Sequence, residues 1–593
     1  MCGIAGKISL NRDVSQTELK RAAHALRHRG PDDEGIYLSE EHHVGLAHRR
    51  LSLIDLSEQG HQPMLTTDEQ YSIVFNGEIY NYVEIRNELI SAGVNFHSHS
   101  DTETILNGYV HWGKDILRRL KGMFAFAIYD RKKEELFLAR DRFGIKPLFY
   151  SFQNGKFFFG SEIKAIKAMD DFYSQIRPAS VASFLANRYI TDHCTMWESV
   201  DKLPPAHHLT IDIRNLEKKI ACYWSLPSVI REEKPELIFE KFEHLFSNAL
   251  REHLRSDVPI GAFLSGGLDS SATVMLMQSE LHYSTTAFSI GFNNWKESED
   301  KYARMVTDFT GAELRTLLLD RIDMAVMPTL MYHYDDPIAD ISILPTYAVS
   351  GLASQSVKAV ISGEGADELL GGYWWQKPEN FNPGGNLLRK WLSRFRDINK
   401  EDIKRHYITA MSMGLFSSAE LRKALAGAFR AAVPDDVFSH LDSLMHPELS
   451  TIKQIQYLDI HRFMADLVLT KVDRASMAHS LEVRVPFLDH EMVEWLFSLP
   501  EPAYMQQSVQ KPLLQKLLKD KVPQEILHRP KQGFVGPDKF YMDFELYKST
   551  LSKGALIQHE VIQPRYLQQL LLLRDHWRLW KLFVLEHWWR VWC

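Results

Sequence analysis

This sequence contains few cysteines and has no excess of positive charge. Its 593 residues include four cysteines, and no two of them have the CxxC spacing of a metal-binding pair. We therefore expect neither a disulfide framework nor a zinc site. Lysine and arginine number 69 against 76 aspartates and glutamates, which gives a net charge of -7. Because this balance leaves no basic stripe for phosphates, we expect no nucleic-acid partner.

Long hydrophobic runs are missing as well. No stretch approaches the roughly 18 to 20 apolar residues of a membrane span, and the opening MCGIAGKISL does not resemble a signal peptide. These absences predict a cytoplasmic protein without membrane contact. The segment His576–Cys593 is rich in tryptophan and leucine but is interrupted by charges. It predicts an amphipathic helix that docks on the core, with an interfacial membrane helix as the alternative.

The length of the chain predicts more than one domain, because a single hydrophobic core stops growing at roughly 250 to 300 residues. A hydrophobic fraction of 45% and a charged fraction of 24% are typical of globular proteins. The first 200 or so residues contain short apolar segments that predict strands, such as Tyr71–Phe75, Phe124–Tyr129 and Glu135–Ala139. Asn76-Gly77 is expected to close one strand, and Gln153–Gly155 indicates a hairpin.

The pattern of apolar residues changes after the polar stretch Ile213–Lys219, where longer helical patterns begin. Short buried strands interrupt those patterns, and two of them, Pro259–Leu264 and Val357–Ser362, end at glycine-rich segments as parallel strands do at a nucleotide site. Helices are predicted over Glu236–Leu254 and Ile452–Leu469. We place the domains at residues 2–212 and 213–593, the first rich in strands and the second α/β with many helices.

A cysteine directly follows the initiator methionine. If Met1 is removed, Cys2 carries both a thiol and a free α-amine, and the amine can take up the thiol proton because its reference pKa is near 8. Taken alone, Cys2 is better interpreted as an unremarkable N-terminal residue. Five further runs change that weighting: Met1–Gly6, Arg27–Asp32, His48–Ser52, Phe75–Asn81 and Ser100–Glu103.

Together these runs closely resemble the class II glutaminase domain of the N-terminal-nucleophile amidotransferases. The resemblance implies an αββα sandwich and a glutamine site. Cys2 would attack the amide, while the side chain of Asn76 and the backbone N–H of Gly77 would hold the oxyanion. The same resemblance assigns glutamine binding to Arg49 for the α-carboxylate, to Asp101 for the α-ammonium and to Glu78. Without it, Arg49 could equally be a surface charge.

The segment Ser265–Ser271, SGGLDSS, lies between an apolar strand and a helical run, which is a phosphate-binding arrangement. Gly266 and Gly267 let backbone N–H groups approach phosphate oxygens, Ser265 and Ser270 add hydroxyl donors, and Asp269 can hold Mg²⁺. The GxxxxGK[ST] pattern of γ-phosphoryl transfer is absent. The segment instead resembles the PP-loop of ATP pyrophosphatases, of the adenine nucleotide α-hydrolase-like fold, which implies release of AMP and pyrophosphate.

A second acidic loop, Ser362–Tyr373, follows another short strand. It could be a solvated loop, but it resembles the asparagine synthetase domain. That resemblance implies that Asp367 joins Asp269 on Mg²⁺ and that Glu364 acts as a general base. Lys471–His490 and Arg529–Phe534 match the same family, with Lys531 meeting the pyrophosphate. The resemblance further places backbone groups of four residues against the nucleotide: Leu264, Ile290, Ser362 and Gly363. Ile290 is equally well interpreted as core.

The sequence thus resembles the glutamine-hydrolysing asparagine synthetases. We expect glutamine hydrolysis at Cys2, an apolar channel for ammonia, and an acyl-adenylate formed from ATP and aspartate. The segment Asp335–Pro345 resembles the substrate-side segment of this family. The acceptor stays open because Asp336 stands where the family pattern often has glutamate. Two alternatives therefore remain: an amidotransferase for another carboxylic acid in a biosynthetic or cell-surface pathway, and an inactive homologue that senses glutamine or nucleotide. A homodimer is a family expectation.

Overall fold

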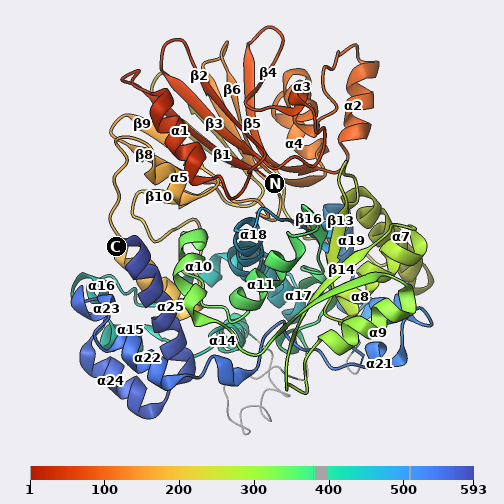
Figure 1. Ribbon diagram of the computed structural model, residues 1–593, viewed down its shortest axis with the longest axis vertical. Helices are drawn as coiled ribbons and strands as arrows, with labels where there is room; N and C mark the ends of the chain where they lie inside the picture. The colour runs from red at the N-terminus through yellow and green to blue at the C-terminus, as the bar shows by residue number, and fades with distance from the viewer. Residues whose placement is uncertain (1, 378–379, 381–398, 507–508) are drawn as a thin grey trace.

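The computed structural model describes residues 2–377, 380, 399–506 and 509–593. Its first part is a sandwich of two six-stranded sheets with helices outside each sheet, which confirms the predicted αββα arrangement (Figure 1). In order across the first sheet the strands are β10 (Val200–Lys202), β8 (Phe149–Gln153), β9 (Lys156–Gly160), β1 (Gly3–Ser9), β3 (Val44–Arg50) and β2 (Asp33–Leu38). Across the second sheet they are β12 (Lys218–Cys222), β11 (His207–Asp212), β7 (Glu135–Arg140), β6 (Gly122–Asp130), β5 (Tyr71–Ile79) and β4 (Met64–Leu65).

A core of apolar side chains lies between the two sheets, with Ile4, Leu46, Val74 and Leu138 among them. All seven residues of β1 are buried, because one face of this strand meets the second sheet and the other meets helices. The helices of this part are α1 (Gln16–Ala25), α2 (Tyr82–Ser91), α3 (Asp101–Trp112), α4 (Ile116–Arg119), α5 (Ile163–Lys167) and α6 (Pro178–Asn187). Helices α1 and α5 pack on the first sheet, and α3 packs on the second.

The prediction that Asn76-Gly77 closes a strand is wrong. Strand β5 continues to Ile79, and Gly77 stands opposite Phe124 of β6. Glycine is required there by close approach, since a Cβ would lie 2.1 Å from the carbonyl oxygen of Met123. The predicted hairpin at Gln153–Gly155 is confirmed: Asn154 and Gly155 have φ values of 49° and 71° and join β8 to β9.

The second part contains a five-stranded parallel sheet, in the order β15 (Glu313–Leu319), β14 (Thr286–Phe292), β13 (Ile260–Phe263), β16 (Ala359–Ile361) and β17 (Glu482–Arg484). The predicted strands are therefore present, and β13 and β16 are neighbours. Each runs into a glycine-containing turn followed by a helix, α8 (Leu268–Met275) after β13 and α12 (Ala366–Leu370) after β16. Their carboxyl ends thus meet at one edge of the sheet, where α/β folds bind nucleotides.

Helices surround this sheet, and the predicted helices over Glu236–Leu254 and Ile452–Leu469 are both present. The second begins as α17 (Thr451–Leu458) and continues through the π-helical segment Asp459–Val468 into α18 (Leu469–Met477). The remaining helices are α7 (Pro235–His253), α9 (Asp300–Thr310), α10 (Met327–Tyr334), α11 (Ile343–Ala353), α14 (Lys400–Met411), α15 (Ser418–Ala424), α16 (Gly427–Ala431), α19 (His490–Ser498), α20 (Pro512–Leu518), α21 (Gln524–Leu527), α22 (Phe544–Leu551), α23 (Ala555–Gln558), α24 (Pro564–Leu573) and α25 (His576–Trp592).

Helix α25 docks on the core as predicted for His576–Cys593. It lies alongside α10, and most of its residues are buried (Figure 1). Among the described residues, no helix is long and apolar enough to cross a membrane. The strand pairing of the first part reaches Cys222 through β12, so the division after residue 212 stays a prediction. The start of β1 lies at the end of the sandwich that faces the second part (Figure 1).

Candidate active sites

Cys2 lies buried at the start of β1, and its backbone N–H donates to Oδ1 of Asn76 at 3.0 Å. That bond fixes the orientation of the Asn76 amide. The other end of the amide, Nδ2, is buried and has no hydrogen-bond partner among the described residues. A buried donor without a partner is costly, so it indicates a position where a ligand oxygen can accept. Asn76 is thus oriented to donate to an oxyanion beside Cys2.

The backbone N–H of Gly77 is the second donor that we predicted for the oxyanion. Phe124, which stands opposite Gly77, directs both of its backbone groups to Asp141 instead. Its N–H donates to the Asp141 carboxylate at 3.1 Å, and its carbonyl accepts from the Asp141 N–H at 2.8 Å. Because both backbone groups of Phe124 bond to Asp141, the N–H of Gly77 is favoured as a donor for a ligand.

Two charged side chains predicted to hold glutamine lie at the same end of the sandwich. Arg49 stands opposite Gly3 in the β1–β3 pairing, and its guanidinium donates to Glu34 at 2.6 Å. A glutamine carboxylate at Arg49 would therefore share this group with Glu34. Asp101 begins α3, and its Oδ2 accepts from the backbone N–H of Ile79 at 3.0 Å. Burial raises the pKa of Asp101 to about 6.

The thiol of Cys2 is held in its neutral form. Burial raises the pKa of Cys2, an effect that the N–H of Leu51 and the charge of Arg50 offset in part. His48, on the neighbouring strand, donates through Nε2 to the carbonyl of Phe75 at 3.0 Å, and its Nδ1 has no hydrogen-bond partner among the described residues. Burial lowers the pKa of His48 to about 3, so this imidazole is neutral at pH 7. The thiol therefore requires a separate base, which is the role that we predicted for the α-amine of Cys2.

Glu78 was predicted to bind glutamine, and the structure places it in the contact between the two parts of the chain. Its Oε2 accepts from Arg484 of β17 at 2.8 Å, and Arg484 also pairs with Glu482 at 2.6 Å. Burial raises the pKa of Glu78, against the opposing charge of Arg484. Its part in glutamine binding stays a prediction.

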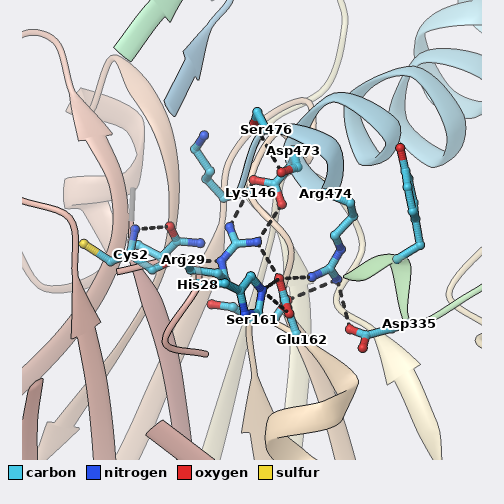
Figure 2. Close-up of polar contacts among 12 residues, drawn as sticks. Cys2, His28, Arg29, Lys146, Ser161, Glu162, Asp335, Asp473, Arg474 and Ser476 are labelled. Carbon is cyan, nitrogen blue, oxygen red and sulfur yellow. Dashed lines mark hydrogen bonds and ion pairs between the residues drawn. The ribbon is translucent and has the colours of Figure 1, made fainter. Parts of the chain in front are cut away.

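A buried ionic network joins the nucleophile to the second part (Figure 2). Arg29 donates through Nε to the carbonyl of Cys2 at 3.0 Å and through Nη1 to Glu162 at 2.8 Å. The same guanidinium pairs with Asp473 of α18 at 2.9 Å. Arg474, the next residue of α18, reaches Glu162 at 2.7 Å. Arg29 lies in the run Arg27–Asp32, but the sequence indicated no role for it. Only folding brings Asp473 next to it.

The second site is a cavity of about 380 Å³ at the carboxyl ends of β13 and β16. Most of the predicted nucleotide residues line it, namely Leu264, Ser265, Gly267, Asp269, Ser270, Ser362 and Gly363. Gly266 and Ile290 are not among the described residues that line it. Gly266 has a φ of 69°, and a Cβ there would lie 2.4 Å from that of Tyr302, so it shapes the turn. Ile290 is buried within β14.

Two lysines gather the carboxylates predicted to bind Mg²⁺. Lys511 contacts both Asp269 and Asp367, the latter at 2.6 Å, and Lys531 pairs with Asp367 at 2.6 Å and with Asp269 at 3.8 Å. Burial alone would raise the pKa of Asp367, but the two lysines outweigh it and hold that pKa below its ordinary value. The carboxylates thus converge on one point, as a shared cation requires. Among the described residues, no group of three acidic, histidine or cysteine side chains could hold a metal.

Lys511 is a site residue that sequence reasoning missed. It precedes α20 with φ and ψ of 46° and 66°, in the left-handed region, and its side chain is almost completely buried. The only sequence feature there is a lysine before Pro512, which is too common a pair to indicate a function. Glu364, by contrast, was predicted and lines the cavity, where its Oε2 accepts from the hydroxyl of Ser362.

One wall of the cavity is formed by Asp340, Ile341 and Ser342, from the segment that resembles the substrate side of the family. Lys471 donates to the hydroxyl of Ser342 at 2.9 Å. Asp336 is the residue that left the identity of the acceptor open, and it is not among the described residues that line the cavity. Its Oδ1 accepts from the backbone N–H of Met196 at 2.8 Å. Burial raises the pKa of Asp336 to about 6. The aspartate at this position therefore bears on local packing rather than on direct contact with an acceptor in the cavity.

Two protein-family models match different parts of this chain. A family model described as a glutamine amidotransferase domain matches residues 1–224, and one described as asparagine synthase matches residues 241–590. The chain is 34% identical to asparagine synthetase [glutamine-hydrolyzing] 1 of Bacillus subtilis, over 92% of this chain and 88% of that protein. It is 32% identical to a putative asparagine synthetase [glutamine-hydrolyzing] of Mycobacterium bovis, over 91% and 88% of the two chains.

A solved glutamine phosphoribosylpyrophosphate amidotransferase from B. subtilis also matches, with 14% identity and a TM-score of 0.30. That match covers 55% of this chain and 68% of the other. So slight a likeness has no bearing on the sites.

Proposed function

The chain belongs to the asparagine synthase family, and from that premise we propose that it is a glutamine-dependent asparagine synthetase. The reaction converts glutamine, aspartate, ATP and water to glutamate, asparagine, AMP and pyrophosphate. The observation that carries this proposal is that one residue touches both sites. The guanidinium of Arg484 pairs with Glu78, which follows Gly77 in β5. Its backbone carbonyl accepts from the N–H of Ser362 at 2.9 Å, and Ser362 lies two residues before Glu364.

In the proposed glutaminase step the sulfur of Cys2 attacks the side-chain carbonyl carbon of glutamine. The oxyanion that forms accepts hydrogen bonds from Nδ2 of Asn76 and the N–H of Gly77, which stabilise it. The α-amine of Cys2, free once Met1 has been removed, takes the thiol proton and passes it to the departing ammonia. Water then releases glutamate from the thioester. Met1 itself lies outside the described residues.

In the proposed synthetase step a carboxylate oxygen of aspartate attacks the α-phosphorus of ATP, and pyrophosphate leaves. The serines and backbone N–H groups of Ser265–Ser270 hold the leaving phosphates, while Lys531 and Lys511 balance the charge that develops on them. Asp269 and Asp367 would hold Mg²⁺, which supplies further positive charge to the phosphates when bound. Glu364 takes the proton that the attacking nitrogen loses at the acyl-adenylate.

Transfer of ammonia between the sites is part of the same proposal. Ammonium predominates over ammonia in water at pH 7 and is not a nucleophile, so a route closed to water favours the second step. Two buried ion pairs support such a route, Arg484 with Glu78 and Arg29 with Asp473. Each pair joins the first part of the chain to the second. An apolar channel there, a homodimer and a cytosolic location remain predictions.

Aspartate is favoured as the acceptor by the names of the curated relatives. An inactive sensor is disfavoured, since Cys2, Asn76 and Glu364 are all present at their sites. The test is to incubate the full chain with glutamine, ATP, Mg²⁺ and aspartate carrying ¹⁸O in its side-chain carboxylate. We expect asparagine in amounts equal to AMP, with one ¹⁸O atom transferred to AMP. Formation of ADP, or AMP without label, would refute the acyl-adenylate. ATP–pyrophosphate exchange with a panel of other acids would reveal a different acceptor.

A further inference from the structure

The acceptor-side wall of the nucleotide cavity belongs to a segment without regular secondary structure. Residues 335–342 connect α10 to α11, and the last three of them line the cavity. Outside helices and strands, backbone carbonyls lack the partners that regular structure supplies. The position of this wall therefore depends on which groups donate to those carbonyls.

Three aromatic side chains from the last part of the chain supply the donors. The indole of Trp588 donates to the carbonyl of Asp335 at 2.6 Å, and the indole of Trp580 donates to that of Ala339 at 3.0 Å. The hydroxyl of Tyr541 donates to the carbonyl of Ile341 at 2.9 Å. The side chains of Trp580 and Tyr541 also pack edge to face, with ring centroids 5.7 Å apart. The C-terminal region thus holds the segment at three places, two of them through α25.

Helix α25 is itself fixed to the rest of the protein. Lys581 is fully buried and donates to the carbonyls of Leu185 at 2.7 Å and Gly414 at 2.9 Å. The C-terminal end of α6, close to that anchor, holds the segment from another side. There the carbonyl of Arg188 accepts from the N–H of Ala339 at 2.8 Å, and its guanidinium contacts Asp340 at 3.4 Å. The segment is therefore clamped between α6 and α25.

We propose that Trp580 and Trp588 are positioning residues for the acceptor: through the carbonyls of Ala339 and Asp335 they fix Asp340 and Ser342 in the wall of the cavity. The identity of the acceptor as aspartate rests on the proposed function. Removing an indole N–H leaves a buried carbonyl without its donor, and the segment relaxes toward another partner. The wall then fits the acceptor less well, while the glutamine site and the loop at Ser265 keep their own contacts.

Trp580 is the sharper probe of the two. Asp335, whose carbonyl Trp588 holds, also contacts Arg474 and Lys164 in the network that leads to Arg29 and Cys2 (Figure 2). A change at Trp588 would therefore reach the glutamine site as well. Among the described residues, the backbone of Ala339 bonds to Trp580 and to Arg188, and neither of these belongs to that network.

The test compares Trp580→Phe with Trp589→Phe in the full chain. Trp589 lies on the same helix and is equally buried, but its indole donates to His559 at 2.8 Å and not to the segment. We expect Trp580→Phe to raise the KM for aspartate by about five- to tenfold. The KM for glutamine and the rate of glutamine hydrolysis should not change, and Trp589→Phe should resemble the wild type. Equal shifts in the aspartate KM for both variants would overturn the proposal.

A second measurement does not depend on which acid is the acceptor. Hydrogen–deuterium exchange at residues 335–345 should become faster in Trp580→Phe and stay unchanged in Trp589→Phe, because only the first loses a donor to this segment. Unchanged exchange in both variants would refute the clamp even if synthesis falls. If the wild type shows the clamp but makes no asparagine, the proposed function fails and the positioning role stands for another acceptor.

Discussion

The glutamine site and the nucleotide site achieve their charge balance in opposite ways. Around Cys2 the nucleophile and Asn76 belong to the start of β1 and to β5, and the neutral amide nitrogen of Asn76 is one of the buried polar atoms left without a partner among the described residues. In the nucleotide cavity two carboxylates, Asp269 and Asp367, lie in the first turns of α8 and α12 and are held by two lysines. One site presents a fixed neutral donor, and the other presents charges that are already paired.

The difference matches the substrates that each site would take. Glutamine brings a neutral amide to Asn76, so a preformed donor serves it without rearrangement. ATP with a metal brings several charges, and its binding would exchange carboxylate–lysine pairs for carboxylate–metal and lysine–phosphate pairs. We therefore expect changes in the first site to affect the use of glutamine alone, and changes in the second to affect synthesis from any nitrogen source.

Replacing the nucleophile should separate the two sites most completely. In Cys2→Ala, glutamine-dependent synthesis should fall at least about a thousandfold, because the thioester cannot form. Synthesis from added ammonium should persist at a rate close to that of the wild type, since the second site is intact. Both activities can be followed as the rates at which asparagine and AMP form. Loss of the ammonium-dependent reaction would show that the two sites are not independent.

The reciprocal change is Glu364→Gln in the nucleotide cavity. Asparagine formation from either nitrogen source should fall about 10²- to 10⁴-fold, because the attacking nitrogen loses its base. Hydrolysis of glutamine should continue, as glutamate release shows. Glu236→Gln, at an exposed position of α7, is the control and should change neither reaction. If Glu364→Gln leaves ammonium-dependent synthesis intact, this glutamate is not the base.

Much of both sites could be predicted because their residues stand in short motifs on single strands or turns. Asn76 and Asp101, for example, lie 25 residues apart in the sequence, yet each was found from its own neighbours. Lys511 could not be predicted, because its role comes from a left-handed backbone and from Asp269, which is 242 residues away in the chain. Partners brought together only by folding leave no local pattern.

The local sequence around Asn76-Gly77 and around Asp336 did not reveal the partners that folding gives these residues. Asn76-Gly77 has the composition of a hairpin turn, but pairing of β5 with β6 overrides that local preference and continues the strand. Asp336 stands in a segment that lines the cavity, but its carboxylate turns to the N–H of Met196. The amphipathic pattern of α25 predicted docking correctly, yet the carbonyls to which Trp580 and Trp588 donate could not be inferred from it.

Changing the oxyanion donor tests whether the unpartnered amide of Asn76 is functional. In Asn76→Ala the rate of glutamine hydrolysis should fall about 10²- to 10³-fold, with little change in the KM for glutamine, because the oxyanion forms only during reaction. Synthesis from ammonium should be unaffected. A fall in kcat accompanied by an equal rise in KM would instead indicate that Asn76 binds the substrate itself.

The smallest effect should come from pH, through Asp101. Burial raises the pKa of this carboxyl to about 6, so above that pH it is ionised and can pair with the α-ammonium of glutamine. Below it, protonation removes the charge, and the KM for glutamine should rise about tenfold for each further pH unit. Glutamate release at pH 5 to 8 measures this. Asp101→Asn should bind glutamine more weakly and lose the dependence, because an amide does not titrate. If the variant keeps the wild-type profile, the titrating group is another one, and Asp101 does not meet the ammonium.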